Sequence, residues 1–513
     1  MLASPQDTKT EVSLDTAALR ELHMAPFPRS GPEMLTFENQ VFAASIVLGD
    51  SITRAQIERA HLDALFVAEA IASARERSAV PLRHKGTRVT SILLLGGTRV
   101  LVSTPYLRED RRGRRGPKRT KRREAGSGCY PVLEALGISD RATPATRSEI
   151  ALHVVQSASY REAALVLERR GLACDLSTLV RITSATAHQG LRLRDSALEA
   201  ALSMPIPTDG PLAGKRVRIS LDGGRVRTRR TKRGRRTAKR RHAFTTHWRE
   251  PRVLVIDILD EEGRPDRLRL PLYEATIRDA HAVWAMVVGY LRLLGAAHAR
   301  HVEFIADGAP WIWDHVGLLR ELAEIPADRL VEVIDFYHAA EHLFASVELI
   351  KQMPKRERVR LYERLRHLLR HDPEGVERVI EALRSHAVTR RGKAMKKALA
   401  YFETHREHMR YAWLDEQKLP VGSGVVESAI RRVVNLRFKA AGTFWIEARV
   451  DALLHLRAAF KSGRWDEIFR GVLSGKFLTP DFDFSHRDTP THEAEVVELQ
   501  KPTGARSAQK KAS

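Results

Sequence analysis

The chain has 513 residues, of which 43% are hydrophobic and 29% charged, a composition that can bury sizeable cores and suits about three domains. Its two cysteines exclude a disulfide framework and argue against a cysteine-based zinc site, and they suit a reducing cytosol. The start of the chain lacks the apolar core of a signal peptide, and the longest uncharged apolar stretch, Ala282–Leu291, is too short to cross a bilayer.

The formal net charge of +23 is concentrated in two runs of the sequence. Arg111–Arg123 holds nine basic residues and Arg225–Arg241 holds eleven, and neither run contains an acid. The rest of the chain is close to neutral, which excludes a uniformly basic packaging protein. Two basic arms on a globular body indicate a polyanionic partner, and we expect double-stranded DNA rather than a membrane. The residues expected to contact DNA in these runs are Arg111, Arg112, Arg114, Arg115, Arg229, Arg230, Lys232, Arg233, Arg235 and Arg236.

The first elements along the chain are expected to form a small unit of their own. Residues 1–50 are mixed in character and spotted with proline, so we expect them to be loosely ordered. Apolar residues at helical spacing predict a helix over Thr53–Ser78. Arg88–Leu95 and Arg99–Thr104 flank a Gly-Gly pair and predict a β-hairpin. The first basic run, which contains Gly and Pro, follows as an arm and completes residues 51–141.

Residues 142–205 are predicted to be helical. Within them, Tyr160–Arg169 and Leu176–Ala187 are separated by a break at Gly171, which suggests a helix-turn-helix that recognises DNA. A plain helical bundle stays open as the alternative, because the link between the two helices is longer than a tight turn.

The pattern after residue 205 changes to alternating strands and helices. This order predicts a mixed α/β sheet over residues 206–336 and 416–460, interrupted by an all-helical segment over residues 337–415. Residues 461–513 are expected to form an extension and a disordered tail. The expected strands are Val217–Leu221, Arg252–Leu259, Arg267–Leu272, His301–Ala306 and Leu330–Ile334, and the expected helices between them are Asp279–Leu294 and Pro310–Glu324.

Two of the expected strands end in an aspartate followed by glycine, at Asp222 and at Asp307. If the strands are neighbours, both carboxylates emerge at one edge of the sheet. Such oxygens suit Mg²⁺ or Mn²⁺, and two ions about 4 Å apart clamp the attacking and leaving oxygens of a phosphodiester. Asp-Gly is also a common turn signal, so the pair alone is weak evidence.

A third carboxylate is needed to close such a site, and Glu427 is the candidate. It follows Gly422-Ser423-Gly424 and opens a helix that carries Arg431 and Arg437, cations suited to a phosphate backbone. The other acids that remain open for this role are Glu447, Asp451, Asp279 and Asp314.

These residues lead to a known family. The chain resembles the DDE transposases of bacterial insertion sequences, most closely the Kra-type insertion-sequence family. The match covers about residues 215–460 in order. The matching segments are Leu221-Asp222-Gly223, Trp248–Arg252, Ile305–Ile312, Asp335–His342 and Gly422–Ser428.

The resemblance implies a ribonuclease-H-like catalytic core with a helical insertion. It implies that Asp222, Asp307 and Glu427 hold two Mg²⁺ (or Mn²⁺) ions, and that Asp335 and His338 support the site beside the DNA. It also implies a nucleoid-associated enzyme that binds the terminal repeats of its element and target DNA as a homodimer or higher oligomer. Relatives often carry a Cys-x-x-Cys pair after the hairpin, whereas this chain has only Cys129 there, so a zinc knuckle is not expected.

Other readings of the same residues stay open. His338–His342 fits H-x-x-E-H, the inverted zinc-protease signature, but a protease would not explain the two strand-end aspartates or the basic arms. A non-catalytic DNA-binding protein derived from a transposase would use the helices and arms alone. A structure-specific nuclease would use the same metals without joining DNA. Trp311 and Trp313 could stack on unpaired bases or pack a helix onto the sheet.

Overall fold

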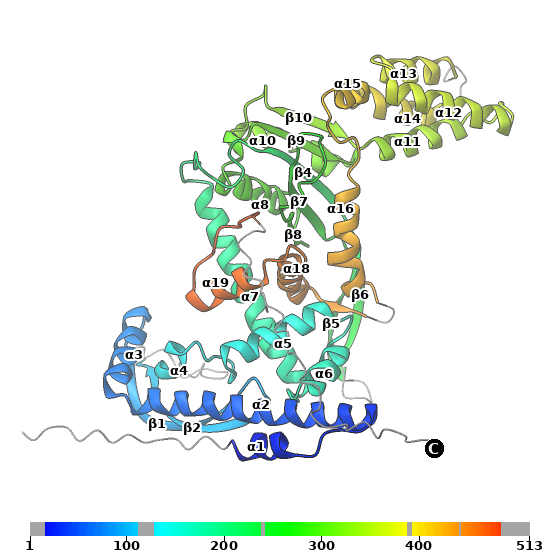
Figure 1. Cartoon of the computed structure of the whole chain (residues 1–513). Coiled ribbons are helices and arrows are strands. Elements are labelled where there is room, and N and C mark those ends of the chain that lie inside the picture. The colour runs from blue at the N-terminus through cyan, green and yellow to red at the C-terminus, as the bar shows by residue number, and fades with distance from the viewer. Residues whose placement is uncertain (1–15, 111–127, 237–241, 387–391, 441–442, 484–513) are drawn as a thin grey trace, which may run out of the picture.

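The computed structural model describes residues 16–110, 128–236, 242–386, 392–440 and 443–483. A helical N-terminal region lies at one end of the molecule, a β-sheet layered with helices lies in the middle, and a separate group of helices projects from the far end (Figure 1). None of the described helices is long and apolar enough to cross a membrane. The whole of the first basic run, including Arg111, Arg112, Arg114 and Arg115, and residues 484–513 of the tail lie outside the described residues.

The N-terminal region is more ordered than the sequence suggests. Residues 17–50, expected to be loose, contain α1 (Ala17–Met24) and most of the long helix α2 (Gly31–Leu62), so that expectation is wrong for this stretch. Ser30 caps α2 by accepting a bond from the backbone N–H of Glu33. Asp50 then ties α2 to the hairpin turn, because its carboxylate accepts bonds from Gly96 N at 2.9 Å and Thr98 N at 3.0 Å.

The predicted hairpin is confirmed, and the helices that follow it are close to the predicted ones. The hairpin strands are β1 (Leu82–Leu93) and β2 (Arg99–Glu109), with a short β3 (Gly128–Cys129) beside them. Burial raises the pKa of the Cys129 thiol to about 11, and the charge of Glu134 adds to the shift, which is unfavourable for a zinc-binding thiolate. The remaining helices here are α3 (Ala64–Arg77), α4 (Pro131–Ala135), α5 (Pro144–Gln156), α6 (Tyr160–Arg169) and α7 (Leu176–Ala201).

The α6–α7 pair has the predicted starts, but α7 is much longer than expected. Its second half packs on the central sheet region, where Leu191 and Leu198 belong to the two main apolar cores. α7 therefore links the N-terminal region to the core, and the role of the α6–α7 pair in recognising DNA stays a prediction.

The central sheet is mixed, as predicted, with five strands in the order β10-β9-β4-β7-β8. β4 runs parallel to β9, β9 runs parallel to β10, and β7 and β8 continue the sheet in antiparallel fashion. Both faces are covered: α8 packs on one and α18 on the other. The strands are β4 (Arg216–Gly223), β7 (Arg252–Leu259), β8 (Leu272–Thr276), β9 (His301–Ala306) and β10 (Leu330–Ile334).

The strand β8 lies later than the predicted Arg267–Leu272. Its central residue, Glu274, is buried and breaks the apolar pattern that would have marked the strand. The charge is tolerated because His455 Nδ1 lies 3.0 Å from the Glu274 carboxylate and Tyr290 donates a bond of 2.7 Å to it. The sequence pattern therefore does not reveal β8, because Tyr290 and His455, the partners of its buried Glu274, lie on helices outside the strand.

The second basic run, which we expected only to form an arm, has regular secondary structure in its described part. It forms most of an exposed β-hairpin of β5 (Val226–Arg236) and β6 (His242–Arg249), and residues 237–241 lie outside the described chain. Val226 and Thr228 are buried at its base, where β5 also pairs in parallel with β11 (Trp445–Ile446). The rest of β5 is exposed and strongly charged.

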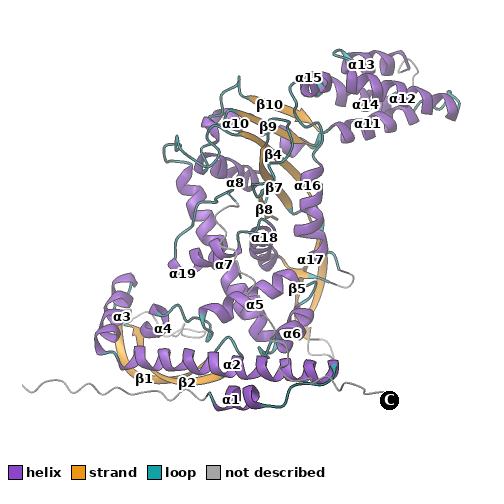
Figure 2. Ribbon diagram, in the orientation of Figure 1, coloured by secondary structure: helices purple, strands orange, loops and turns teal. Residues whose placement is uncertain are grey.

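The described part of the predicted insertion consists of helices joined by short links (Figure 2). Its apolar core continues onto β9 and β10 of the sheet. The core includes Val347, Leu365 and Phe402. Its helices are α11 (Phe336–Glu348), α12 (Lys355–His371), α13 (Gly375–His386), α14 (Lys393–Thr404) and α15 (Tyr411–Glu416), with a 3₁₀ turn at Arg406–His408.

The chain returns to the sheet through a helix that changes type along its length. It begins as α16 (Gly424–Ala429), continues as a π-helical segment (Ile430–Asn435) and ends as α17 (Leu436–Phe438). π-Helical segments often accompany functional sites. The other helices of the core are α8 (Ala280–Leu293), a 3₁₀ turn (Ala296–His298), α9 (Pro310–Trp313), α10 (Leu318–Glu321), α18 (Glu447–Lys461) and α19 (Trp465–Ser474).

Candidate active site

The two strand-end aspartates lie side by side. β4 and β9 pair in parallel with Leu221 opposite Ala306, so the next residues, Asp222 and Asp307, leave the sheet at the same edge. Asp222 Oδ1 accepts a bond of 2.5 Å from the N–H of Gly223, and Asp307 Oδ1 accepts one of 3.0 Å from that of Ala309. Neighbouring parallel strands thus bring two carboxylates together, as the sequence predicted.

Glu427 comes to the same edge from the other side of the insertion. It lies exposed in the first turn of α16, a helix that packs against β4 and β7. The pKa of Asp222 is raised to about 6 by burial and by the negative charges of Asp307 and Glu427, against the opposing effects of Gly223 N–H and His338. Asp307 and Glu427 therefore lie close enough to Asp222 for their charges to act on it.

Asp335 is a buried clamp at the end of β10. Its Oδ1 accepts bonds from the N–H groups of Tyr337, at 2.6 Å, and His338, at 3.0 Å, and so caps α11. Its Oδ2 accepts bonds from the N–H and the hydroxyl of Ser423. Burial would raise the pKa of Asp335, but the bonds from His338 and Ser423 outweigh it and lower the pKa to about 2. The clamp fixes the segment before Glu427 to the start of the insertion.

The glycine beside Ser423 is needed for this clamp. A Cβ atom at Gly422 would lie 2.7 Å from the ring of Tyr337, closer than real Cβ contacts allow. Any larger residue would have to push the Tyr337 ring away from the loop that holds Ser423.

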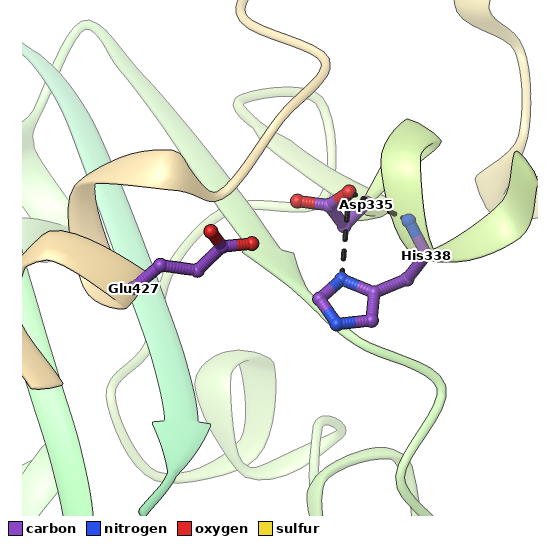
Figure 3. Close-up of side chains that lie close together, drawn as sticks. All are labelled: Asp335, His338 and Glu427. Atoms are coloured by element: carbon purple, nitrogen blue, oxygen red, sulfur yellow. Dashed lines mark hydrogen bonds and ion pairs between the residues drawn. The ribbon is translucent and has the colours of Figure 1, made fainter. Parts of the chain in front are cut away.

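His338 extends the clamp toward Glu427. Its Nδ1 lies 3.6 Å from Asp335 Oδ1, and the interaction with Asp335 raises the pKa of His338 to about 9, with Asp307 and Asp222 adding to the effect and burial opposing it. Oxygens of Asp335 and Glu427 and a ring nitrogen of His338 lie within 4.8 Å of one another, and the carboxyl groups of Asp335 and Glu427 face each other (Figure 3). Asp335, His338 and Glu427 therefore lie together, and Asp222 and Asp307 lie near enough for their charges to act on His338.

The chemistry of these residues favours one set of them as metal ligands. Asp335 already accepts two bonds on each carboxylate oxygen, which leaves no lone pair for an ion. Asp222, Asp307 and Glu427 keep oxygens free for hard cations such as Mg²⁺ or Mn²⁺. A bound cation would offset the burial and the neighbouring negative charges that raise the pKa of Asp222. The ligand type of these three acids therefore suits such metals, whereas the described residues whose ligand atoms lie within 4.8 Å of one another are Asp335, His338 and Glu427.

The zinc-protease alternative finds no support in the geometry. In the part of the chain that the structure describes, the one group with metal-binding proximity joins His338 to Asp335 and Glu427, and not to His342. The His342 ring instead stacks on Tyr401, with the ring centroids 3.9 Å apart. His338 and His342 therefore lie on one helix but do not form a zinc site together.

The cations expected to contact DNA divide into two groups. Those of the β5–β6 hairpin (Arg229, Arg230, Lys232, Arg233, Arg235 and Arg236) are exposed, and so is Arg431. Arg437 is only 2% exposed, and its guanidinium donates a bond of 2.6 Å to the carbonyl of Ala158 and lies over the Trp445 ring. The prediction that Arg437 contacts DNA is therefore wrong, because this side chain fixes α17 to the α5–α6 link.

The two tryptophans after Asp307 are used for packing. The indole N–H of Trp313 donates a bond of 2.5 Å to the carbonyl of Asp307, and the guanidinium of Arg252 lies 4.6 Å from the centre of the Trp311 ring. Trp313 also contacts the rings of His405 and His408. The packing interpretation is the one that these contacts favour, and Trp313 braces the strand end that carries Asp307.

The alternative third acids all have other partners or positions. Asp451 is buried and accepts bonds from Thr276 and Arg278, Glu447 pairs with Arg249 at 2.9 Å, and Asp279 caps α8. Asp314 ends the short helix α9. Glu427 is thus the acid of this set that lies with Asp222.

Three residues near the site were not singled out from the sequence. Ser423 holds Asp335, the carboxylate of Glu250 lies against Gly223, and Tyr401 of the insertion lies against Gly308. The Gly after each strand-end aspartate was a visible signal for close approach, but the identity of the approaching residue depends on tertiary packing.

Comparisons of the chain with protein-family models, with curated proteins and with solved structures found no match. The chemistry of the site itself therefore carries the functional proposal.

Proposed function

We propose that the protein is a DDE transposase of the bacterial insertion-sequence type, most similar to the Kra-type family, that cleaves DNA at the ends of its element and joins those ends to target DNA. One observation carries the proposal: Asp222, Asp307 and Glu427 converge at one sheet edge beside an exposed basic hairpin. Carboxylates that bind hard metals and a cationic surface are the two parts that phosphodiester chemistry requires.

The fold supports this proposal at the level of architecture. A mixed five-stranded sheet carries the first two acids, a helical insertion follows its last strand, and the third acid opens the returning helix (Figure 1). That arrangement agrees with a ribonuclease-H-like core interrupted by an insertion. It also explains how residues more than a hundred positions apart can form one site.

Asp222, Asp307 and Glu427 would hold two Mg²⁺ or Mn²⁺ ions. Bound ions of this kind activate an attacking oxygen and stabilise the leaving oxygen of a phosphodiester. The protein itself supplies the fixed frame: the register of β4 and β9 sets the two aspartates, and the Asp335–Ser423 clamp sets the turn that leads to Glu427. His338, with its raised pKa, presents a positive charge that can face a phosphate.

The hairpin would hold DNA directly over these acids. β5 begins four residues after Asp222, so its base cannot move far from the site. Glu447 fixes that base further through Arg249, at 2.9 Å, and Arg230, at 3.7 Å. The cations beyond the base are free to follow a phosphate backbone, and a homodimer or higher oligomer on DNA would bring two ends together.

The test is a single substitution that keeps shape and removes charge. Asp307→Asn should abolish Mg²⁺-dependent cleavage of a plasmid that carries the DNA flanking the gene, while binding of the same DNA in EDTA stays unchanged. Full cleavage by Asp307→Asn would refute the site. Cleavage by the native protein without any joined product would instead indicate a structure-specific nuclease, and binding without cleavage would indicate a non-catalytic DNA-binding protein.

A further inference from the structure

A tyrosine of the helical insertion lies against the strand end that carries Asp307. A Cβ atom at Gly308 would lie 2.4 Å from Cε2 of Tyr401 and 3.1 Å from its hydroxyl oxygen. The ring and the hydroxyl of Tyr401 therefore lie directly against the backbone that follows Asp307. The absence of a side chain at Gly308 is what allows this approach.

The Tyr401 ring is held firmly in this position. It stacks on the His342 ring at 3.9 Å with an interplanar angle of 15°. The rings of Phe402 and His405 pack against it in T-shaped geometry, with their centroids 5.3 and 5.2 Å from the centroid of the Tyr401 ring. With aromatic groups on these sides, the hydroxyl stays at the site.

The hydroxyl of Tyr401 is buried and has no hydrogen-bond partner among the described residues. A second tyrosine of the insertion, Tyr411, gives the contrast. Its ring is fully buried, and its hydroxyl donates a bond of 3.0 Å to the carbonyl of Ile334. A buried polar group without a partner is costly and calls for an explanation, of which an absent ligand is one. Burial raises the pKa of the Tyr401 phenol, with the charges of Asp307 and Asp335 adding, so the group stays a hydrogen-bond donor.

We propose that the Tyr401 hydroxyl donates a hydrogen bond to a phosphate oxygen of the DNA bound at Asp222 and Asp307, an inference that rests on the proposed function. A donor needs an acceptor, and the nearest strand end is where a phosphodiester would lie during reaction. The helical insertion then supplies a substrate-contacting residue to the core. This would link the insertion, whose purpose the core alone does not explain, to the reaction.

The experiment compares two conservative substitutions in the same helical insertion. Tyr401→Phe keeps the ring and removes the unpartnered hydroxyl, whereas Tyr411→Phe removes a hydroxyl that has a protein partner. Each full-length variant is tested for thermal midpoint, for binding to a plasmid that carries the DNA flanking the gene, and for the single-turnover cleavage rate at saturating protein with Mg²⁺.

Opposite patterns are expected for the two variants. Tyr401→Phe should cleave roughly ten- to a hundredfold more slowly, the range for losing a hydrogen bond to a charged group in the transition state. Its thermal midpoint should equal or exceed that of the native protein, and its affinity for DNA should be unchanged. Tyr411→Phe should melt at a lower temperature and cleave at the native rate below its midpoint.

Cleavage at the native rate by Tyr401→Phe would overturn the inference, and so would a rate loss that only follows a loss of folded protein. The Asp307→Asn variant keeps this result distinct from the proposed function. If Asp307→Asn is active, the proposed site itself fails. If Asp307→Asn is inactive while Tyr401→Phe is as fast as the native protein, only the role of Tyr401 is lost.

Discussion

Glu303 should make the stability of the protein fall as the pH rises. This side chain lies in the middle of β9, the strand that leads to Asp307, and 0% of it is exposed. Neither of its carboxylate oxygens has a hydrogen-bond partner within the described ranges. Its cross-strand neighbour Arg218 is already engaged by Asp257, at 3.1 Å. A buried, unpartnered carboxylate is stable only when it is protonated.

The size of the effect follows from the pKa. Burial raises the pKa of Glu303 from 4.5 to about 8, with Asp257 adding and Arg218 opposing. Between these two pH values the folded protein keeps a proton that the unfolded chain has lost, so the free energy of unfolding decreases by about 1.4 kcal/mol per pH unit. The contribution of Glu303 is therefore fully present below pH 4.5 and is lost progressively up to about pH 8.

Glu303→Gln provides the test, since glutamine keeps the shape and cannot ionise. Urea unfolding of the native protein and of Glu303→Gln should be compared at pH 5 and pH 7.5 by circular dichroism. The variant should gain stability relative to the native protein by about 3 kcal/mol between these two values. A difference that stays constant with pH would refute the reasoning and would mean that Glu303 is charged in the fold.

Two further predictions concern the cations. Four hairpin cations, Lys232, Arg233, Arg235 and Arg236, form no ion pair with another described residue. Replacing all four by Gln should reduce the slope of log K against log[salt] for DNA binding by up to about 4, since each phosphate contact contributes about 0.9. The control replaces the same number of exposed cations on α12, and an unchanged slope in the hairpin variant would exclude the hairpin as a DNA contact. Arg437→Gln should instead lower the free energy of unfolding by about 1–3 kcal/mol, because the bond of the Arg437 guanidinium to the carbonyl of Ala158 is lost. The slope of log K against log[salt] should stay unchanged. A reduced slope would show that the buried position of Arg437 does not describe the DNA-bound protein.

Much of the site was accessible from the sequence because its signals are local. Each of the strands β4 and β9 is a short apolar run that stops at Asp-Gly, so both the strand and the exit point of Asp222 and Asp307 are visible in a few residues. Their pairing follows from the parallel neighbours that an α/β order favours. The helical insertion was visible for the same reason, from the sustained helical pattern.

The features that could not be predicted depend on partners far away in the chain. β5 carries so many charges that no strand pattern marks it, and its base is stabilised by β11, which lies more than two hundred residues later. Arg437 is a cation on the segment that follows Glu427, which favours a DNA contact, yet its side chain packs against the carbonyl of Ala158 and the ring of Trp445. The approach of Tyr401 to Gly308 likewise depends on how the insertion packs on the core.

The most direct test of the central claim is strand transfer by the purified protein. A labelled duplex with the sequence that flanks the gene and a free 3′-OH is incubated with a supercoiled target plasmid and Mg²⁺. The native protein should join the labelled strand to the plasmid, whereas Asp222→Asn, Asp307→Asn and Glu427→Gln should each form no joined product while they bind the duplex with native affinity. Joining by any of the three variants at the native rate would contradict the assignment of these acids as one catalytic site.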